Sequence, residues 1–209
     1  MEVRCYDRGP MTPRLKPLAL DQWTAEAKEL IRGRFAVADK YLSGLPDAPP
    51  MPGILGLFGH HPSLTADWLA FSGGLIENPV VDPADRELLI LRVGWRTQCR
   101  YAWAQHVGMA EKSGLTPLQI AAVAGTADAG VWSDRQSDML TATDQMVADY
   151  RIDDTTWQRL VRHFDEQQLL EFLFVVGSYV CLALVLNAAG LEPDQDADGG
   201  WDALPGLEK

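Results

Sequence analysis

A glutamate, a cysteine and a histidine lie at spacings that allow joint chemistry. Cys99 and His106 are seven residues apart, almost two helical turns, so they would share one face of a helix. Glu87 lies twelve residues before Cys99 and would approach it if two helices pack as antiparallel neighbours. A carboxylate, a thiol and an imidazole at one point can move protons, hold an enolate or reduce a peroxide. Glu87, Cys99 and His106 are therefore candidate catalytic residues.

The position of Cys99 predicts a lowered pKa for its thiol. The helix that carries it is expected to run from about Thr97 to Ser113, which puts Cys99 in the first turn. Unpaired backbone N–H groups and the helix dipole favour a thiolate there, and Arg96 and Arg100 would add positive charge. Taken singly, a cysteine is often just a small buried hydrophobe. The joint spacing of the three residues favours a site over three separate structural roles.

Capping signals mark the helices that must position these residues. Asp82-Pro83 is typical of a helix start, with Asp as the N-cap and Pro at the first helical position. Gly114 is suited to end the helix that carries His106. Capping boxes begin at Thr116 and Ser133 and predict two further helices. No stretch alternates apolar and polar residues for long enough to predict a strand.

The fold class that follows is all-α, a single domain of about seven to nine helices. Residues 1–20 are interpreted as an N-terminal arm and residues 21–191 as the helical domain. Residues 192–209 are rich in Asp, Gly and Pro and are expected to form an acidic mobile tail.

One long apolar helix is expected between Asp165 and Gly190. Its segment 172–186 has only Ser178 and Tyr179 as polar residues, yet it is shorter than the roughly 20 residues that span a bilayer. We therefore expect no membrane partner and a core helix that is buried on all sides, Cys181 included. Tyr179 and Asn187 share one face of this helix, and one of the two is expected to face a pocket.

The composition argues against several other functions. The chain has 209 residues with 18 Lys and Arg against 29 Asp and Glu, a net charge of −11, so it would repel nucleic acid. Its cysteines, Cys5, Cys99 and Cys181, have no CxxC or zinc-site spacing. The adjacent His60 and His61 would point about 100° apart on a helix. We therefore expect no metal and no cofactor. The first twenty residues show no secretory signal, so a cytoplasmic location is expected.

The stretch from Glu87 to His106 resembles the carboxymuconolactone decarboxylase and AhpD-like alkylhydroperoxidase superfamily. The redox branch carries the pattern E-x11-C-x2-C-x3-H, which Glu87, Cys99 and His106 match in register. Ala102 stands where the second cysteine of that pattern falls. Further similarity lies in the segments 86–92, 95–97 and 177–187, so the resemblance covers about residues 54–191.

The resemblance implies an AhpD-like helical fold, assembled as a homo-oligomer (a trimer or a hexamer), with a pocket near the helix of Cys99 and His106. In the redox branch one cysteine attacks a peroxide and the other closes a disulfide, a cycle that Ala102 breaks. In the decarboxylase branch the substrate is a carboxylated lactone, and the chemistry is proton transfer without a redox thiol. The residues expected to line the substrate pocket are Tyr101, Ala102, Trp103, Tyr179 and Asn187.

The leading hypothesis is a small-molecule enzyme that uses acid–base chemistry on an apolar carbonyl- or carboxyl-bearing substrate. The reaction would be a decarboxylation, isomerisation, dehydration or cyclisation. His106 would be the principal proton carrier, Glu87 would orient it or act as the second acid–base group, and Cys99 would be an acid, a nucleophile or a polar wall. One alternative is a one-cysteine alkylhydroperoxide reductase that uses Cys99. A second alternative is an oligomer that binds a small molecule without catalysis.

Overall fold

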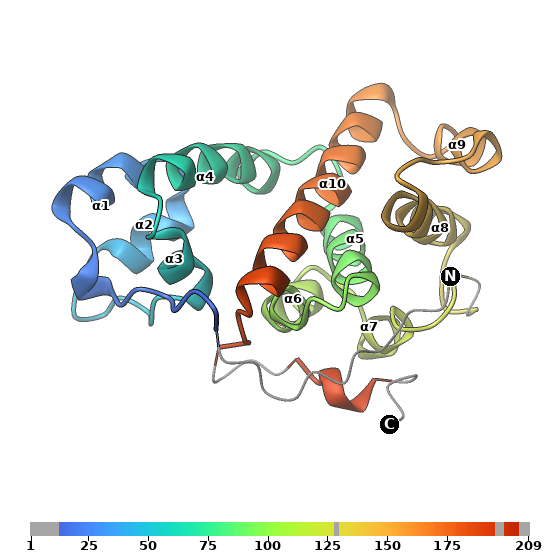
Figure 1. Cartoon of the computed structure of the whole chain (residues 1–209). Helices are drawn as coiled ribbons and strands as arrows, with labels where there is room; N and C mark the ends of the chain where they lie inside the picture. Colours follow the sequence, from blue (N-terminus) through green and yellow to red (C-terminus); the bar gives the residue numbers. More distant parts are fainter. Residues whose placement is uncertain (1–12, 128–129, 195–198, 205–209) are drawn as a thin grey trace.

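The structure, a computed structural model, describes residues 13–127, 130–194 and 199–204, and every regular element among them is a helix (Figure 1). This confirms the all-α class, although the described residues contain ten α-helices rather than seven to nine. The α-helices are α1 (Ala25–Ile31), α2 (Ala36–Leu42), α3 (Gly53–Phe58), α4 (Pro62–Glu77), α5 (Pro83–Arg96), α6 (Arg100–Lys112), α7 (Pro117–Ala122), α8 (Asp134–Asp149), α9 (Asp154–Leu160) and α10 (Glu166–Ala189). Two short 3₁₀ helices are η1 (Leu20–Gln22) and η2 (Trp201–Ala203).

The helix starts follow the capping signals of the sequence. Asp82 accepts a hydrogen bond from the backbone N–H of Ala84 and opens α5. Thr116, Ser133 and Asp165 each form a full capping box, at the starts of α7, α8 and α10. These side chains bind backbone N–H groups that the first turn of a helix leaves unpaired.

The start of α6 differs from the expected one. Thr97 belongs to the end of α5, because its hydroxyl donates to the carbonyl of Val93 at 2.6 Å. Gln98 then reverses the chain with a φ of 55°, and α6 begins at Arg100 with Cys99 as its N-cap. Cys99 therefore lies before the first turn rather than in it.

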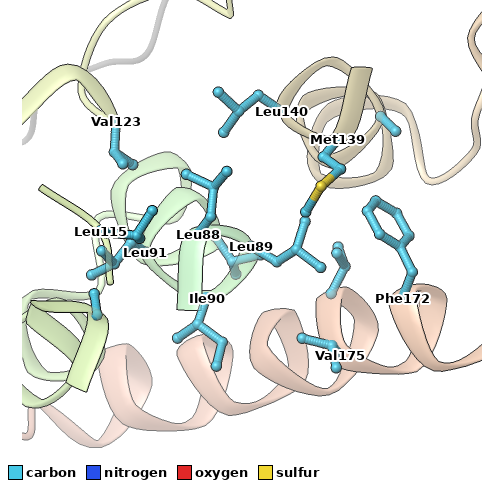
Figure 2. Close-up of a cluster of buried hydrophobic side chains, with 14 of the residues drawn as sticks. Leu88, Leu89, Ile90, Leu91, Leu115, Val123, Met139, Leu140, Phe172 and Val175 are labelled. Atoms are coloured by element: carbon cyan, nitrogen blue, oxygen red, sulfur yellow. The ribbon is translucent and has the colours of Figure 1, made fainter. Parts of the chain in front are cut away.

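Helix α5 is the centre of the larger hydrophobic core. Leu88, Leu89, Ile90 and Leu91 are consecutive and buried, so α5 meets neighbours on all sides. Figure 2 shows Leu88, Leu89 and Ile90 at this core, with Met139 and Leu140 of α8 on one side and Phe172 and Val175 of α10 on another. An α-helix whose residues are buried on all sides must be covered by other elements around its whole circumference.

The N-terminal helices α1 to α4 form a smaller core of their own. Trp23, Ile31, Leu55 and Leu69 are buried together in it. Figure 1 shows this group on one side of α10 and α8 and α9 on the other side, with α5 beside the middle of α10 and α6 near its C-terminal end. The place where the two cores meet is therefore bounded by α2, α3 and α4 on one side and by α5, α6 and α10 on the other.

Part of the segment expected to be a mobile tail is packed instead. Trp201 is buried, and its ring centroid lies 5.3 Å from that of Trp95 and 5.6 Å from that of Trp103. The indole N–H of Trp103 donates to the carbonyl of Gly199 at 3.0 Å. Residues 199–204 of the segment expected to be mobile thus pack against Trp95 and Trp103. Residues 195–198 and 205–209 lie outside the described residues, as does Cys5.

The prediction that α10 is buried on all sides is also wrong. The helix packs against α5 and α8, but Leu170, Phe174 and Leu184 keep between 50% and 67% of their surface exposed. Cys181, expected in the core, is exposed as well. By length and composition alone α10 could cross a membrane, and 33% of its most apolar window is buried in the structure. One largely apolar face of α10 is thus left uncovered by the described part of the chain.

Arg92 joins three helices from within the core. Its guanidinium donates to both carboxylate oxygens of Asp144 on α8, at 2.7 and 2.6 Å. It also donates to the carbonyls of Val123 and Gly125, which follow the last turn of α7. The side chain of Arg92 is 3% exposed, so this charge depends on protein partners rather than on water.

We predict that Arg92→Ala lowers the free energy of unfolding by about 3 kcal/mol, because it leaves the Asp144 carboxylate and two carbonyls without their buried donor. Urea denaturation followed by circular dichroism measures this change. Arg96→Ala is the matched control, since Arg96 reaches the same carboxylate at 3.4 Å from a more exposed position. Its cost should stay below about 1 kcal/mol. Equal costs for the two variants would contradict the assigned role of Arg92.

Candidate active site

Glu87 and His106, which were expected to approach each other from two neighbouring helices, are in contact in the structure. Residues 97–99 form a short turn, so α5 and α6 pack side by side and Glu87 meets His106. The distance from Oε2 of Glu87 to Nδ1 of His106 is 2.7 Å, and both side chains are buried. The distance is typical of a charge-assisted hydrogen bond.

The environment keeps Glu87 ionised. Burial alone would raise the pKa of its carboxyl group. The hydrogen bond and charge of His106, together with the neighbouring Arg86, outweigh burial and hold the pKa below the usual range. A carboxylate can only accept hydrogen bonds, so the proton of this bond lies on Nδ1 of His106. The neutral imidazole then has its free electron pair on Nε2.

Tyr179 of α10 occupies that second nitrogen. Its hydroxyl oxygen lies 3.1 Å from Nε2 of His106, and the two rings meet edge to face with centroids 5.2 Å apart. Burial raises the pKa of Tyr179 above its usual value, so the phenol keeps its proton. The hydroxyl therefore donates to Nε2 when the imidazole is neutral. Glu87, His106 and Tyr179 form one continuous hydrogen-bonded chain.

A cavity of about 250 Å³ lies where the two cores meet, and the chain of hydrogen bonds ends in it. His106 and Tyr179 both line its wall, together with Arg86 and Gln105. None of the described Asp or Glu residues does so. The other lining residues are mostly apolar and come from α2, α3, α4, α6 and α10; among them are Phe35, Leu55, Phe58, Trp68, Ile76 and Leu182.

Arg86 supplies the formal positive charge of this cavity. Its side chain is 11% exposed, and Nε and Nη2 approach Oε1 of Glu87 at 3.4 and 3.3 Å. These are long hydrogen bonds, and the other terminal nitrogen has no hydrogen-bond partner among the described residues. The sequence did not indicate Arg86 as a residue of the site. Its position next to Glu87 does not show which way its side chain points.

Cys99 does not join the pair. It is fully buried among side chains of α6 and α10, including Ala183 and Leu186, and it does not line the cavity. Burial raises the pKa of its thiol to about 11, and the backbone hydrogen bonds from residues Ala102 and Tyr101 only partly oppose this. The prediction of a lowered pKa is therefore wrong, because desolvation outweighs the start of the helix.

The five residues expected to bind substrate divide into two groups. Tyr101, Ala102 and Tyr179 line the cavity. Trp103 packs in the tryptophan cluster instead, and the amide of Asn187 donates to the carbonyl of Thr97 at 2.8 Å, beyond the last turn of α5. As expected, one polar residue of the pair on α10 faces the pocket, and it is Tyr179.

The C-terminal segment also supports the cavity wall, which the sequence did not indicate. Asp194 accepts hydrogen bonds from the Tyr101 hydroxyl at 3.0 Å and from the Gln105 amide at 2.8 Å. Its other oxygen accepts from the backbone N–H of Gly53, at the start of α3. One carboxylate thus ties α3 and α6 together at the edge of the cavity.

The adjacent histidines His60 and His61 have separate structural roles. Nε2 of His60 lies 2.9 Å from the carbonyl of Lys16, and Nδ1 of His61 accepts from the backbone N–H of Leu64 at the start of α4. In the described part of the chain, no group of three or more His, Cys, Asp or Glu side chains is placed to hold a metal ion.

Comparison with known proteins supports the resemblance seen in the sequence. Residues 62–145 match the model of the Carboxymuconolactone decarboxylase family (CMD), a span that includes Glu87, Cys99 and His106. No curated protein matches the chain.

Several solved structures share the fold at low sequence identity. An uncharacterized peroxidase-related protein from Ralstonia eutropha, described as an alkylhydroperoxidase AhpD core, is 16% identical with a TM-score of 0.73, over 92% of this chain and 97% of that one. A peroxidase-related protein from Silicibacter sp. is 16% identical with a TM-score of 0.71, over 93% and 98%. A cysteine-to-alanine variant of the debrominase Bmp8, in complex with 2,3,4-tribromopyrrole, is 11% identical with a TM-score of 0.70, over 90% and 95%. These likenesses show an AhpD-like fold.

We predict that the Glu87 carboxylate contributes stability at neutral pH that is lost in acid. Its pKa is lowered in the folded state, so folding favours the ionised form above the unfolded pKa of about 4, and the gain disappears as the pH falls through the folded value. Urea unfolding of the wild type and Glu87→Gln between pH 7 and pH 3 measures this. The stability of Glu87→Gln should fall less on acidification. Glu29→Gln, on an exposed ion pair, is the control and should follow the wild type.

We predict that Cys99 does not react with hydrogen peroxide or iodoacetamide in the folded protein at pH 7. Its thiol is buried, and a pKa of about 11 leaves only about one thiolate in 10⁴ at that pH. Cys181 is exposed and serves as the internal control that should be alkylated. Peptide mapping by mass spectrometry distinguishes the two. Oxidation of Cys99 to a sulfenic acid ahead of Cys181 would show that its environment is not the one described.

Proposed function

We propose that the chain is an enzyme of acid–base chemistry acting on a small apolar substrate that bears a carbonyl or carboxyl group. Its match to the Carboxymuconolactone decarboxylase family over residues 62–145 and its AhpD-like fold support this. The reaction would be a decarboxylation, isomerisation, dehydration or cyclisation. Each of these moves a proton to or from a carbon or oxygen next to a carbonyl group. No resident cofactor is part of the proposal.

The observation that carries the proposal is the hydrogen-bonded chain from Glu87 through His106 to Tyr179, which ends in a largely apolar cavity. Both ring nitrogens of His106 are occupied, Nδ1 by Glu87 and Nε2 by Tyr179. With Tyr179 in this position, its hydroxyl is the group of the chain that can meet a substrate. His106 then serves as the proton reservoir behind it.

The chain can take up a proton in one concerted step. The substrate C–H bond breaks, its electron pair stays on the substrate as an enolate, and its proton goes to the Tyr179 oxygen. The Tyr179 proton passes at the same time to Nε2 of His106, and the Glu87 carboxylate stabilises the imidazolium that forms. Because burial disfavours a free phenolate, the two transfers must be coupled. The reverse sequence delivers a proton to the substrate.

The cavity supports a substrate that is mostly apolar with one negative or electron-rich end. Its wall is dominated by aliphatic and aromatic side chains, whereas Arg86 places guanidinium N–H groups close to His106. Such donors can stabilise the oxyanion of an enolate in a site that excludes water. A volume of about 250 Å³ suits a molecule the size of a substituted ring. The tribromopyrrole bound to the similarly folded debrominase Bmp8 is a ligand of this kind.

Specific features of the structure argue against the two alternatives, a one-cysteine hydroperoxide reductase and a binding protein without catalysis. A one-cysteine hydroperoxide reductase needs a reactive thiolate, but Cys99 is buried away from the cavity and its pKa is raised. A purely binding protein would not need Glu87, whose burial is costly, oriented behind His106. The geometry therefore favours proton transfer over both.

We predict that the protein accelerates exchange of the α-protons of phenylpyruvate or phenylacetone in D₂O, measured by NMR. Each probe carries a carbonyl group on an apolar body of suitable size. His106→Ala, Glu87→Gln and Tyr179→Phe should each slow exchange by about 100-fold or more, since general acid–base groups contribute that much. Tyr150→Phe, at an exposed position far from the cavity, is the matched control and should leave the rate unchanged.

Two outcomes separate the parts of this proposal. If neither probe exchanges faster than in buffer and the variants do not differ, acid–base catalysis on carbonyl compounds is ruled out for these substrates and the binding alternative gains. If His106→Ala abolishes exchange but Tyr179→Phe does not, the imidazole meets the substrate directly and Tyr179 only fills the cavity.

A further inference from the structure

The side-chain amide of Gln105 is held in one orientation at the wall of the candidate active site. Its Nε2 lies 2.8 Å from Oδ2 of Asp194. A carboxylate can only accept hydrogen bonds, so the amide nitrogen faces Asp194 and the amide oxygen faces away from it. No described residue donates a hydrogen bond to that oxygen. The amide therefore keeps a free acceptor in a fixed position.

Asp194 is itself held in place by donors from other elements. Its Oδ2 also accepts from the Tyr101 hydroxyl at 3.0 Å, and its Oδ1 accepts from the backbone N–H of Gly53 at 3.0 Å. A Cβ atom on residue 53 would lie only 3.0 Å from Oδ1, so the lack of a side chain at Gly53 allows this close approach. The carboxylate thus has a defined position from which it orients the amide of Gln105.

The oxygen of this amide is directed toward the cavity. Tyr101, Gln105 and Met109 follow one another at intervals of four residues on α6, and all three line the cavity. Asp194, which holds the amide nitrogen, does not line it. The nitrogen therefore faces the C-terminal segment behind the cavity wall, and the oxygen faces the interior on the same wall as His106.

Three hydroxyl groups of the lining already donate their protons within the chain. Ser72 and Ser178 donate to backbone carbonyls of their own helices at 2.8 and 3.0 Å. The Tyr101 hydroxyl donates to Asp194 and accepts from the backbone N–H of Ile54 at 3.0 Å. A hydroxyl that donates in this way has no proton left for a ligand. The lining thus favours a ligand that brings a hydrogen-bond donor of its own.

We propose that Gln105, positioned by Asp194, accepts a hydrogen bond from a hydroxyl or N–H group of the substrate. The substrate is then an apolar molecule that bears such a donor in addition to its carbonyl or carboxyl group. A ligand without the donor leaves the amide oxygen unpaired in an apolar cavity, and sites built to bind a polar group discriminate against analogues that lack it. This specificity rests on the proposed function, because it concerns the substrate of the same cavity.

Isothermal titration calorimetry of the full chain with phenylacetone and its ortho-, meta- and para-hydroxy derivatives tests the role of Gln105. At least one hydroxy isomer should bind at least about 10-fold more tightly than phenylacetone. The corresponding methoxy derivative should not share this gain, because it has no proton to donate. Gln105→Leu should reduce the hydroxyl preference to within about 2-fold. Gln158→Leu, at an exposed position on α9, is the matched control and should keep the wild-type preference.

The role of Asp194 is tested by the same ratio of dissociation constants in Asp194→Ala. The preference for the hydroxy isomer should fall by at least about 3-fold, because the released amide can turn its nitrogen toward the cavity. A cavity that merely collapsed would weaken all ligands alike and leave the ratio unchanged. Asp202→Ala is the matched control, since Asp202 lies on the same C-terminal segment in an exposed ion pair with Arg100.

Three results would overturn the assignment of Gln105. These are equal affinity for phenylacetone and every hydroxy isomer, a preference that survives Gln105→Leu, and no binding of any hydroxy isomer at about 5 mM. A preference that survives Asp194→Ala would overturn the positioning role of Asp194. Proton exchange in D₂O with the same ligands separates this specificity from the catalytic proposal. Exchange without a hydroxyl preference removes the specificity alone, whereas a preference without exchange supports the specificity and removes the catalysis.

Discussion

The burial of charged residues in α5 is the constraint on which the rest of the structure depends. Asp85, Arg86, Glu87 and Arg92 are all buried in this one helix, next to leucines that form the core. An unpaired charge in such a place would cost several kcal/mol, so each needs a partner. Arg86 pairs with Glu87 within α5, and the other three residues have partners on neighbouring helices. Arg135 of α8 pairs with Asp85, Asp144 of α8 pairs with Arg92, and His106 of α6 pairs with Glu87. The position of α5 against α6 and α8 is thereby fixed by ion pairs as well as by apolar packing.

The same burial of charged residues orients the side chains of the candidate active site. Glu87 is held by His106 and Arg86 on one side and by the core on the other, so its carboxylate has little freedom to rotate. A hydrogen bond in these surroundings is stronger than one in water, because few solvent dipoles screen it. His106 is therefore kept in one tautomer, with Nε2 directed at Tyr179 and the cavity. The stability of the fold and the orientation of the imidazole depend on the same carboxylate.

Local structure could be predicted from the sequence more completely than the burial of individual side chains. Asp82, Thr116, Ser133 and Asp165 are confirmed as helix caps, because a cap is a contact between residues close in the chain. The Glu87–His106 contact could also be predicted, because a short turn joins the two helices that carry these residues. The raised pKa of the Cys99 thiol could not be predicted in this way. Burial raises it, and part of that burial comes from Ala183 and Leu186 of α10, which are distant in the sequence. Trp103 was misjudged for a similar reason, since Trp201 of the C-terminal segment covers it.

Ala102 lines the cavity at the position where the redox pattern of the resembled superfamily has its second cysteine. It lies one helical turn before His106 on α6, so its methyl group borders the imidazole on the cavity side. A cysteine here would bring a thiol to the cavity, with Cys99 buried behind it. Alanine leaves the volume open and uncharged, and the group within hydrogen-bonding distance of Nε2 becomes the Tyr179 hydroxyl from α10. With alanine at this position His106 has no thiol one turn away on α6, and the proposed proton transfer would use the Tyr179 hydroxyl as the oxygen acid at this histidine.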